Sequence, residues 1–301
     1  MTARSVGQLI DDVARQFTKH RLHFGHGTTT AHEEAQWLVS HATKLSFRQL
    51  KASSAMQRLV TPSEADFVAA AAERRCRTRE PLAYVLNEAW LGPHRFYVDQ
   101  RAIVPRSFLA EHLRSARLPW LQAATDVTRV LDLCTGSGSL AICAAHRFRD
   151  ALVDASDISR DALAVAERNV SEHSMQARVR LIESDLFAAL ATERYDLILS
   201  NPPYVTERAM RALPDEYRAE PRISLAGGVD GLDVVDRIVR KAREHLKPNG
   251  WLVMEIGDNR RAMTARFERL PLRWFSNNLV CAIQEKHLVI HSTDRGRLKT
   301  D

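Results

Sequence analysis

The first eighty residues carry the hydrophobic spacing of helices. Apolar residues recur at helical intervals near the start of the chain: Val6, Leu9, Ile10, Val13 and Phe17. Further on, Thr61-Pro62-Ser63-Glu64 combines a capping hydroxyl, a proline in the first turn and a glutamate at the third position. The Ala-rich run that follows predicts a helix to about Arg75. We therefore expect residues 1–80 to form a small helical N-terminal domain.

Pro81 marks a change from helical to alternating spacing. Residues 83–104 alternate apolar and polar side chains around Gly92-Pro93, which predicts a β-hairpin. We expect residues 81–108 to contain this hairpin and to link the helical domain to the remainder of the chain.

From about Leu109 onward, apolar runs alternate with amphipathic segments. The runs predict strands at residues 129–134, 152–156, 178–183, 195–200 and 250–256. Helices are predicted near residues 139–147, 160–173, 231–246 and 259–269. This alternation is typical of an α/β fold whose parallel, doubly wound sheet has right-handed crossovers. We expect residues 109–301 to form one such domain.

Composition places the chain among ordinary globular proteins. Its 301 residues are 45% hydrophobic, which is enough to bury a substantial core. No apolar stretch approaches the ~20 residues of a membrane span, and the first residues lack the apolar core of a signal peptide. The four cysteines form no Cys-x-x-Cys pair, so no zinc site or disulfide framework is indicated. A soluble, cytoplasmic protein without a metal or membrane contact is expected.

Positive charge is concentrated rather than spread. The formal net charge is +6, and residues 260–301 hold nine Lys/Arg against four Asp/Glu. A second basic cluster is Arg74-Arg75-Cys76-Arg77-Thr78-Arg79. Such clusters are typical of solvated surface, and they also suit a weak contact with RNA. The charge leaves both interpretations open and names no substrate.

Candidate chemistry appears first at Asn201-Pro202-Pro203-Tyr204, directly after the strand predicted at residues 195–200. The prolines end that strand, which leaves an amide at the carboxyl edge of the sheet, where open α/β sheets bind ligands. The oxygen of Asn201 can accept a hydrogen bond from a planar NH2 group, and Tyr204 offers an aromatic face. This arrangement suits an amide or exocyclic amine presented to an electrophile. A simple strand-ending turn is the alternative.

A glycine-rich turn lies between the strand at residues 129–134 and the helix at residues 139–147. Gly136 and Gly138 let the backbone approach a ligand, and the helix start offers free N–H groups. With Asp157 after the next strand, the motif fits either a nicotinamide dinucleotide or S-adenosylmethionine. Asp132 would repel a pyrophosphate but suits an ammonium and a sulfonium. The pattern therefore favours S-adenosylmethionine.

Together these motifs resemble those of the protein-glutamine N5-methyltransferases, which modify translation release factors and one ribosomal protein. The matching residues are Asp132, Cys134-Thr135-Gly136-Ser137-Gly138, Asp157, Ser184-Asp185-Leu186-Phe187 and Asn201-Pro202-Pro203-Tyr204. Further matches are residues 97–99, 104–107, 214–221 and 227–232, with Glu111. Residues 24–28, 83–85 and 89–90 look more like the branch that acts on large-subunit ribosomal protein number three. The resemblance covers roughly residues 20–260.

The resemblance implies a Rossmann-like, seven-stranded S-adenosylmethionine-dependent methyltransferase sheet beside the helical N-terminal domain. It also implies an antiparallel final hairpin, which we place near residues 273–291. Residues 276–281 lack the Gly-rich, Asp-containing turn of the relatives, so the sequence supports this hairpin least. Residues 1–80 are expected to dock the substrate, with a purely structural cap as the alternative.

The resemblance also implies the cofactor site. Its residues would be Asp132, Cys134, Thr135, Gly136, Ser137, Gly138, Asp157, Ile158, Asp185, Leu186 and Asn201. Asp157 would hold the ribose, while Asp185 would lie at the adenine edge beside Leu186. For either aspartate, the alternative is a cap on the following helix.

The reaction implied is an SN2 methyl transfer to the side-chain nitrogen of a glutamine. Asn201, Pro202 and Tyr204 would be catalytic, because the Asn201 oxygen and the Pro202 carbonyl can accept from the target NH2. Pro203, Arg106 and Glu111 complete the expected substrate contacts. The last two could instead tie the hairpin to the sheet.

Three other functions stay open at this point. A release factor is the other glutamine substrate of the family. DNA adenine-N6 methyltransferases share Asn-Pro-Pro-Tyr, but they must flip a base and usually carry a separate recognition region. A non-catalytic S-adenosylmethionine-binding assembly factor is the third. The expected partner is the ribosomal protein, before or during assembly, with a weak ribosomal RNA contact; the sequence does not set the oligomeric state.

Overall fold

The computed structural model describes residues 4–121, 127–190 and 192–289, which fall into two compact units. The helical unit contains Met1–Arg106 and Leu213–Pro221, and the sheet unit contains Ser107–Ala212 and Arg222–Asp301. The boundaries predicted at residues 80 and 108 stay predictions, because compactness alone does not define separately folding domains.

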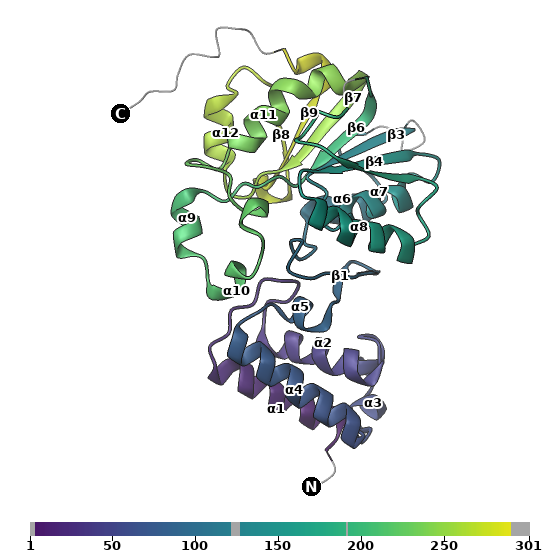
Figure 1. Cartoon of the computed structure of the whole chain (residues 1–301), viewed down its shortest axis with the longest axis vertical. Helices are drawn as coiled ribbons and strands as arrows, with labels where there is room; N and C mark the ends of the chain where they lie inside the picture. The colour runs from purple at the N-terminus through teal and green to yellow at the C-terminus, as the bar shows by residue number, and fades with distance from the viewer. Residues whose placement is uncertain (1–3, 122–126, 191, 290–301) are drawn as a thin grey trace. The chain divides into compact units, whose positions relative to one another are not determined.

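Most of the helical unit is α-helix, as Figure 1 shows. Its helices are α1 (Val6–Lys19), α2 (Ala31–Thr43), α3 (Ser53–Gln57), α4 (Pro62–Thr78), α5 (Leu82–Leu86) and α10 (Asp215–Arg218), with the short 3-10 helix η1 (Gln49–Lys51). The two helices predicted from spacing and caps are confirmed as α1 and α4. The hydroxyl of Thr61 accepts a hydrogen bond from the Glu64 amide, and the Glu64 carboxylate accepts one from the Thr61 amide.

The predicted hairpin exists but is shorter than expected. Strands β1 (Ala89–Leu91) and β2 (His94–Phe96) pair antiparallel. Residues 82–86 were predicted to be part of the hairpin, and this is wrong, because they form α5. Pro81 precedes the first turn of this helix, and Asn87 ends it in a left-handed conformation with φ of 50°. Four of the five α5 side chains are buried, so the local alternation was too short to distinguish strand from helix.

The sheet unit carries the predicted α/β fold. Its strands are β3 (Arg129–Leu133), β4 (Leu152–Asp157), β5 (Val179–Glu183), β6 (Tyr195–Ser200), β7 (Leu246–Glu255), β8 (Arg273–Phe275) and β9 (Val280–Gln284). Its α-helices are α6 (Phe108–Arg114), α7 (Ser139–Arg147), α8 (Arg160–Glu172), α9 (Glu207–Ala212), α11 (Asp233–Ala242) and α12 (Arg260–Arg266). Short 3-10 helices are η3 (Arg222–Ser224), η4 (Arg243–His245), η5 (Ser276–Asn278) and η6 (Glu285–His287).

The seven strands lie in the order β5-β4-β3-β6-β7-β9-β8. Neighbours from β5 to β7 are parallel, whereas β9 runs antiparallel to both β7 and β8. The five predicted strands are confirmed, and so is the final hairpin, which β8 and β9 form within residues 273–284. Residues 290 and 291 of the predicted range lie outside the described residues. Figure 1 shows α7 and α8 on one face of the sheet and α11 and α12 on the other. The helices predicted at 231–246 and 259–269 are confirmed but end earlier, at Ala242 and Arg266.

The chain order places a topological switch point at one edge of this sheet. From β3 the chain winds outward through β4 to β5, and it then returns to β6 on the other side of β3. Connections on the two sides of such a switch point diverge, and ligands of open α/β sheets bind outside the strand ends there. We call the edge at which β3, β4 and β6 end the carboxyl edge.

The core of the sheet unit consists of aliphatic side chains from the central strands. Leu131, Ile198 and Leu252 are fully buried, as are Val235 and Ile238 of the amphipathic helix α11. No helix in the described ranges is both long and apolar enough to cross a membrane.

Candidate active site

Strand register brings the predicted motifs together at the carboxyl edge. Leu133 pairs with Ser156 of β4 on one side and with Ser200 of β6 on the other. The next residues along each strand are Cys134, Asp157 and Asn201. Adjacent strands are about 4.8 Å apart. The glycine-rich turn therefore starts between Asp157, which is expected to bind the ribose, and Asn201, which is expected to bind the target amide.

The Asn201 turn is fixed to the neighbouring strand. The Ser200 hydroxyl donates to the Leu133 carbonyl over 2.9 Å, and Pro202 is buried directly after the half-buried Asn201. The strand therefore ends at a defined position and leaves the Asn201 side chain at the carboxyl edge.

Tyr204 is held at both its backbone and its hydroxyl. The phenol donates to Oε1 of Glu255 over 3.1 Å, and the Tyr204 carbonyl accepts from Nδ2 of Asn259 over 2.7 Å. A Cβ added at Gly257 would lie 2.7 Å from a ring carbon of Tyr204. Only a glycine lets the ring lie this close to the backbone, so the position of Tyr204 depends on Gly257.

The segment at residues 227–232 supports the same turn from a second side. The Gly227 amide donates to the Val205 carbonyl over 2.9 Å. A Cβ at Gly227 would lie 2.7 Å from the Tyr204 Cα, and one at Gly231 would lie 2.4 Å from the Tyr204 carbonyl oxygen. The two motifs that the resemblance treated separately are therefore one structural element.

Glu255 was missed by the sequence reasoning. It is the buried last residue of β7, and its Oε2 accepts from the Ser107 hydroxyl over 2.8 Å and from the Phe108 amide over 3.0 Å. Glu255 thus joins Tyr204 to the start of α6. A signal was present in the sequence, because Glu255 ends an apolar strand predicted to reach the same edge as Asn201.

The glycine-rich turn has the backbone expected of a ligand loop. Gly136 and Gly138 have φ of 55° and 77°, and the non-glycine Cys134 also lies in the left-handed region at 60°. Left-handed non-glycine residues cluster at functional sites, because surrounding structure must offset their strain. The buried Asn169 of α8 donates to the Ser137 carbonyl over 2.9 Å and holds the turn. Asn169 was also missed, although it is a polar residue on the apolar face of its helix.

Asp132 is a buried acid with an incomplete set of partners. Its Oδ2 accepts from the Thr135 hydroxyl over 2.6 Å, whereas Oδ1 is buried and has no hydrogen-bond partner among the described residues. Burial raises the pKa of Asp132 to about 7, despite the hydrogen bond from Thr135. A buried carboxylate of this kind can accept a cationic donor from a ligand.

Asp157 links β4 to the glycine-rich turn. Its Oδ2 accepts from the Gly136 amide and its Oδ1 from the Ser159 amide, each over 2.9 Å. Burial raises the pKa of this carboxyl. Each carboxylate oxygen has a second lone pair, so ribose hydroxyls could still donate to Asp157. The next residue, Ile158, is 51% exposed at the same strand end.

Asp185 and Leu186 follow β5, one strand further along the sheet. Asp185 is exposed and forms an ion pair of 2.7 Å with Arg237 of α11. Leu186 is buried and has a left-handed backbone with φ of 51°. Their placement at an adenine edge stays a prediction.

Arg106 and Glu111 belong to different units. In the helical unit, both terminal nitrogens of Arg106 donate to the carboxylate of Glu220, each over 2.6 Å. This pair joins Arg106 to the segment at residues 213–221 within the helical unit and not to the sheet. A substrate contact by Arg106 stays a prediction. Glu111 is exposed in the first turn of α6.

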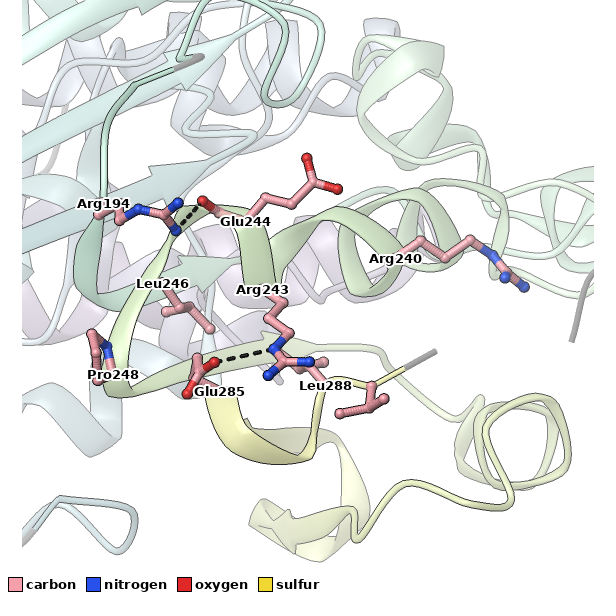
Figure 2. Close-up of a pocket in the computed structure, with 9 residues that line it drawn as sticks. Arg194, Arg240, Arg243, Glu244, Leu246, Pro248, Glu285 and Leu288 are labelled. Carbon is pink, nitrogen blue, oxygen red and sulfur yellow. Dashed lines mark hydrogen bonds and ion pairs between the residues drawn. The ribbon is translucent and has the colours of Figure 1, made fainter. Parts of the chain in front are cut away.

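A pocket of about 540 Å³ lies elsewhere in the sheet unit. Arg194, Arg243 and Leu246 line it, close to where β6 and β7 begin (Figure 2). The Arg194 guanidinium donates to the Glu244 carbonyl, and Arg243 pairs with Glu285 over 3.1 Å. Since this is the amino end of both strands, the pocket is not part of the carboxyl edge.

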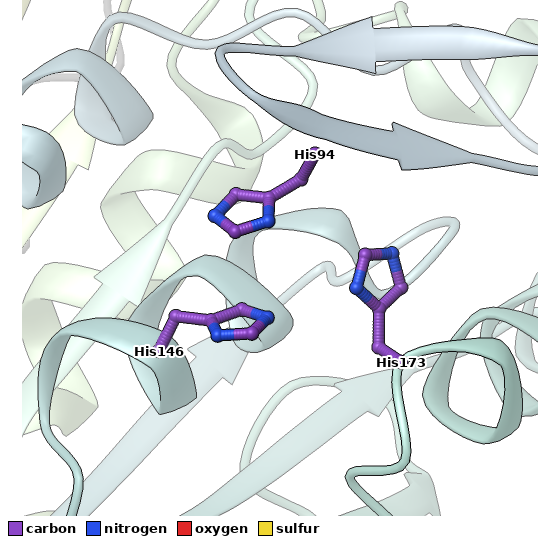
Figure 3. A group of neighbouring side chains, drawn as sticks. All are labelled: His94, His146 and His173. Carbon is purple, nitrogen blue, oxygen red and sulfur yellow. The ribbon is translucent and has the colours of Figure 1, made fainter.

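Two histidines of the sheet unit lie near the end of the helices that flank β4. The ring centroids of His146 in α7 and His173 after α8 are 5.8 Å apart; Figure 3 draws both rings with His94 of the helical unit. The expectation that the protein uses no metal stays a prediction.

Known proteins match this chain over most of its length. A family model described as Methyltransferase small domain matches residues 107–214, and one described as PrmC N-terminal domain matches residues 14–86. The ribosomal protein uL3 glutamine methyltransferase of Burkholderia pseudomallei is 44% identical over 278 residues, covering 90% of each chain. The enzymes of the same name from Bradyrhizobium diazoefficiens and Neisseria meningitidis serogroup B are 48% and 43% identical. Those two alignments cover 86% and 87% of this chain and 82% and 86% of the relatives.

Proposed function

The chain belongs to the family of ribosomal protein uL3 glutamine methyltransferases, and from this membership we propose that it methylates the side-chain amide nitrogen of a glutamine in uL3. The family resemblance inferred from the motifs is confirmed by relatives that span both units. The observation that supports the proposed chemistry best is the pairing of Leu133 with Ser200. Because of this pairing, the glycine-rich turn proposed to bind the cofactor and the Asn201 amide follow the ends of adjacent strands.

S-adenosylmethionine is the proposed cofactor, and its sulfonium would supply the methyl group. The buried Oδ1 of Asp132, which has no hydrogen-bond partner within the described ranges, suits the α-ammonium of such a ligand. Asp157 would accept from the ribose hydroxyls. The left-handed turn from Cys134 to Gly138 would let the backbone approach the ligand closely. Asp185 and Leu186 would lie beside the adenine.

The protein must overcome the weak nucleophilicity of an amide nitrogen. Delocalisation of its lone pair produces the ~18–20 kcal/mol rotation barrier of amides. Asn201 Oδ1 and the Pro202 carbonyl are the proposed acceptors for the target NH2 group, and they would favour the positive charge that develops on nitrogen. Holding the nitrogen in line with the methyl carbon can contribute up to ~7–11 kcal/mol, so orientation is the main proposed effect.

Tyr204 would pack against the amide plane of the substrate. Its ring is confined by Gly257, and its hydroxyl is bound to the buried Glu255. Glu255 is therefore a proposed positioning residue, because it acts on the substrate only through Tyr204. The helical unit would dock the remainder of the ribosomal protein.

A labelling experiment with three acceptors tests this function. S-adenosylmethionine carrying a radiolabelled methyl group is offered with purified uL3, with a release factor and with unmethylated DNA. We expect label on a glutamine of uL3 alone, identified by mass spectrometry. Label in the release factor alone would move the enzyme to the other branch of the family, and label in DNA would reject the glutamine proposal. The cytoplasmic location and the weak ribosomal RNA contact stay predictions.

A further inference from the structure

The helical unit contains a second pocket that the methyl-transfer chemistry does not use. Its volume is about 420 Å³, and its lining includes His26, Glu33, Trp37, Phe47 and Trp90. Phe47 and Trp90 are 41% and 39% exposed, and their ring centroids are 6.4 Å apart in an edge-to-face arrangement. Large exposed aromatic side chains that line a concave site are typical of binding surfaces.

A buried carboxylate is hydrogen-bonded to two of the tryptophans that line the pocket. The indole nitrogens of Trp37 and Trp90 both donate to Oε1 of Glu88, over 3.0 and 2.9 Å. Although burial opposes it, hydrogen bonds from His41, Trp37 and Trp90 lower the pKa of Glu88 to about 2. Arg95 offsets part of this charge from 3.8 Å. A carboxylate bound to the indole N–H groups makes the ring faces more attractive to a cation.

Glu33 adds a second carboxylate to the lining. Its Oε2 accepts from the amide and the hydroxyl of Thr29, over 2.7 and 2.8 Å. These hydrogen bonds lower the pKa of Glu33, so the side chain is charged at neutral pH. The pocket therefore combines aromatic faces with negative charge.

His26 adds a buried hydrogen-bonding group to the pocket lining. It is 2% exposed, and neither ring nitrogen has a hydrogen-bond partner in the described part of the chain. Its Nε2 is 3.6 Å from Oε2 of Glu220, beyond hydrogen-bond distance. Burial lowers the pKa of His26, so the ring is neutral and one nitrogen can accept. A ligand with N–H donors would satisfy it.

From these contacts we infer that the pocket binds a lysine or arginine side chain of the ribosomal protein substrate. Trp90 and Phe47 would contact the cation, and Glu33 would supply charge at the lining. Proteins that assemble on RNA carry clusters of basic side chains, so the charge is complementary. The inference rests on the proposed function, because it assumes that uL3 is the substrate.

Steady-state methylation of purified uL3 is the first test. Trp90→Ala and Glu33→Gln are each expected to raise KM for uL3 about tenfold and to leave kcat within about twofold. Glu73→Gln is the matched control, because Glu73 is exposed on α4 outside the pocket lining. Trp90→Phe keeps an aromatic face and should restore most of the affinity. Unchanged KM in both pocket variants would overturn the inference, and so would a fall in kcat alone.

A substrate-free test separates this inference from the proposed function. N-acetyl-arginine amide, its neutral analogue N-acetyl-citrulline amide and N-acetyl-leucine amide are titrated into the full chain while the indole N–H signals are followed by NMR. We expect the arginine probe alone to shift the Trp37 and Trp90 signals, and Trp90→Phe to retain the Trp37 shift. Equal binding of citrulline or leucine would refute a cation site even if uL3 is methylated. If uL3 is not methylated but the arginine probe binds, the proposed function fails and the cation site stands.

Discussion

Two buried carboxylates, Glu220 of the helical unit and Asp132 of the sheet unit, have opposite surroundings. Glu220 accepts two hydrogen bonds from Arg106 and one from the Val104 amide, over 2.6, 2.6 and 3.0 Å. Burial opposes ionisation, yet the guanidinium of Arg106 lowers the pKa of Glu220 to about 2. Burial instead raises the pKa of Asp132 to about 7, because the hydrogen bonds from Thr135 and the Ala141 backbone do not outweigh the loss of solvation, and no cation opposes it among the described residues.

The difference in surroundings distinguishes a carboxylate that stabilises the fold from one that is available to a ligand. In the helical unit, the fully buried Arg75 donates to Glu34 over 2.7 Å, and Arg79 pairs with the buried Glu216 over 2.7 Å. Charges with such partners are expected to act in folding, because removing one partner leaves the other buried and unpaired. A buried acid that lacks a counter-ion is expected to receive one from a ligand. Variants at these residues test whether each carboxylate stabilises the fold or binds a ligand.

The largest expected effect is on catalysis at the carboxyl edge. Asn201→Ala removes a proposed acceptor of the target amide, so single-turnover methyl transfer should fall about 10³-fold. Because Asn201 is half-buried, we expect the substitution to change the free energy of unfolding of the protein by less than about 1 kcal/mol. Calorimetry should find cofactor affinity within a few-fold of wild type. Unchanged turnover would refute the acceptor role, and a large loss of stability would place Asn201 in the scaffold.

Glu220→Gln should instead affect stability. Loss of the charge leaves Arg106 without its counter-ion, and urea unfolding should show a loss of about 3 kcal/mol. The contribution of Glu220 is present above the ordinary carboxyl pKa of about 4.3, and it is lost as pH falls from about 4 to about 2. Glu73→Gln is the control: because Glu73 is exposed, the free energy of unfolding should change by less than about 0.5 kcal/mol. If Glu220→Gln weakened cofactor binding and left stability unchanged, Glu220 would belong to the ligand site and not to the residues that stabilise the fold.

Asp132→Asn is expected to lower affinity for S-adenosylmethionine about 10- to 100-fold, as one charge-assisted hydrogen bond is lost. The folded pKa lies above that of the unfolded chain, so the cofactor-free protein should lose stability as pH rises from about 4 through about 7. The variant should lack this slope, and cofactor affinity of the wild type should fall below about pH 7. Calorimetry measures the cofactor affinity and urea unfolding measures the stability, each at pH 5 to 8. A variant less stable than wild type at pH 8 would contradict a ligand role for Asp132.

The smallest effect is expected at the contact between Tyr204 and Glu255. Tyr204→Phe removes one hydrogen bond of 3.1 Å and should lower kcat several-fold, with KM for uL3 little changed. Glu255→Gln should lower kcat similarly and should also destabilise the start of α6, where it binds Ser107 and Phe108. If Glu255 acts through Tyr204, the double variant is no slower than the worse single variant. Additive losses in kcat would refute this coupling.

Much of the fold could be predicted from local patterns. Apolar runs identified β3 to β7, and the cap at Thr61 identified α4. The final hairpin was inferred by resemblance alone, and it forms although residues 276–281 lack the expected turn. There the structure uses Asn277 and Asn278 with positive φ of 53° and 74° in place of glycine. Asparagine tolerates the left-handed region, so the geometry of the turn survives a change of residue type.

The sequence by itself determined most of the strands and the chemistry at their ends. Hydrophobic period, capping residues, prolines and glycines act on their immediate neighbours, so Asn201-Pro202-Pro203-Tyr204 and the turn at Gly136 could be identified without a structure. Only the tertiary structure decided which partners those residues have. Glu255 reaches Tyr204 from 51 residues away, and Glu220 reaches Arg106 from 114 residues away. Such contacts depend on strand order, register and the burial of charge, which arise only when the whole chain packs and leave no periodic mark in the sequence.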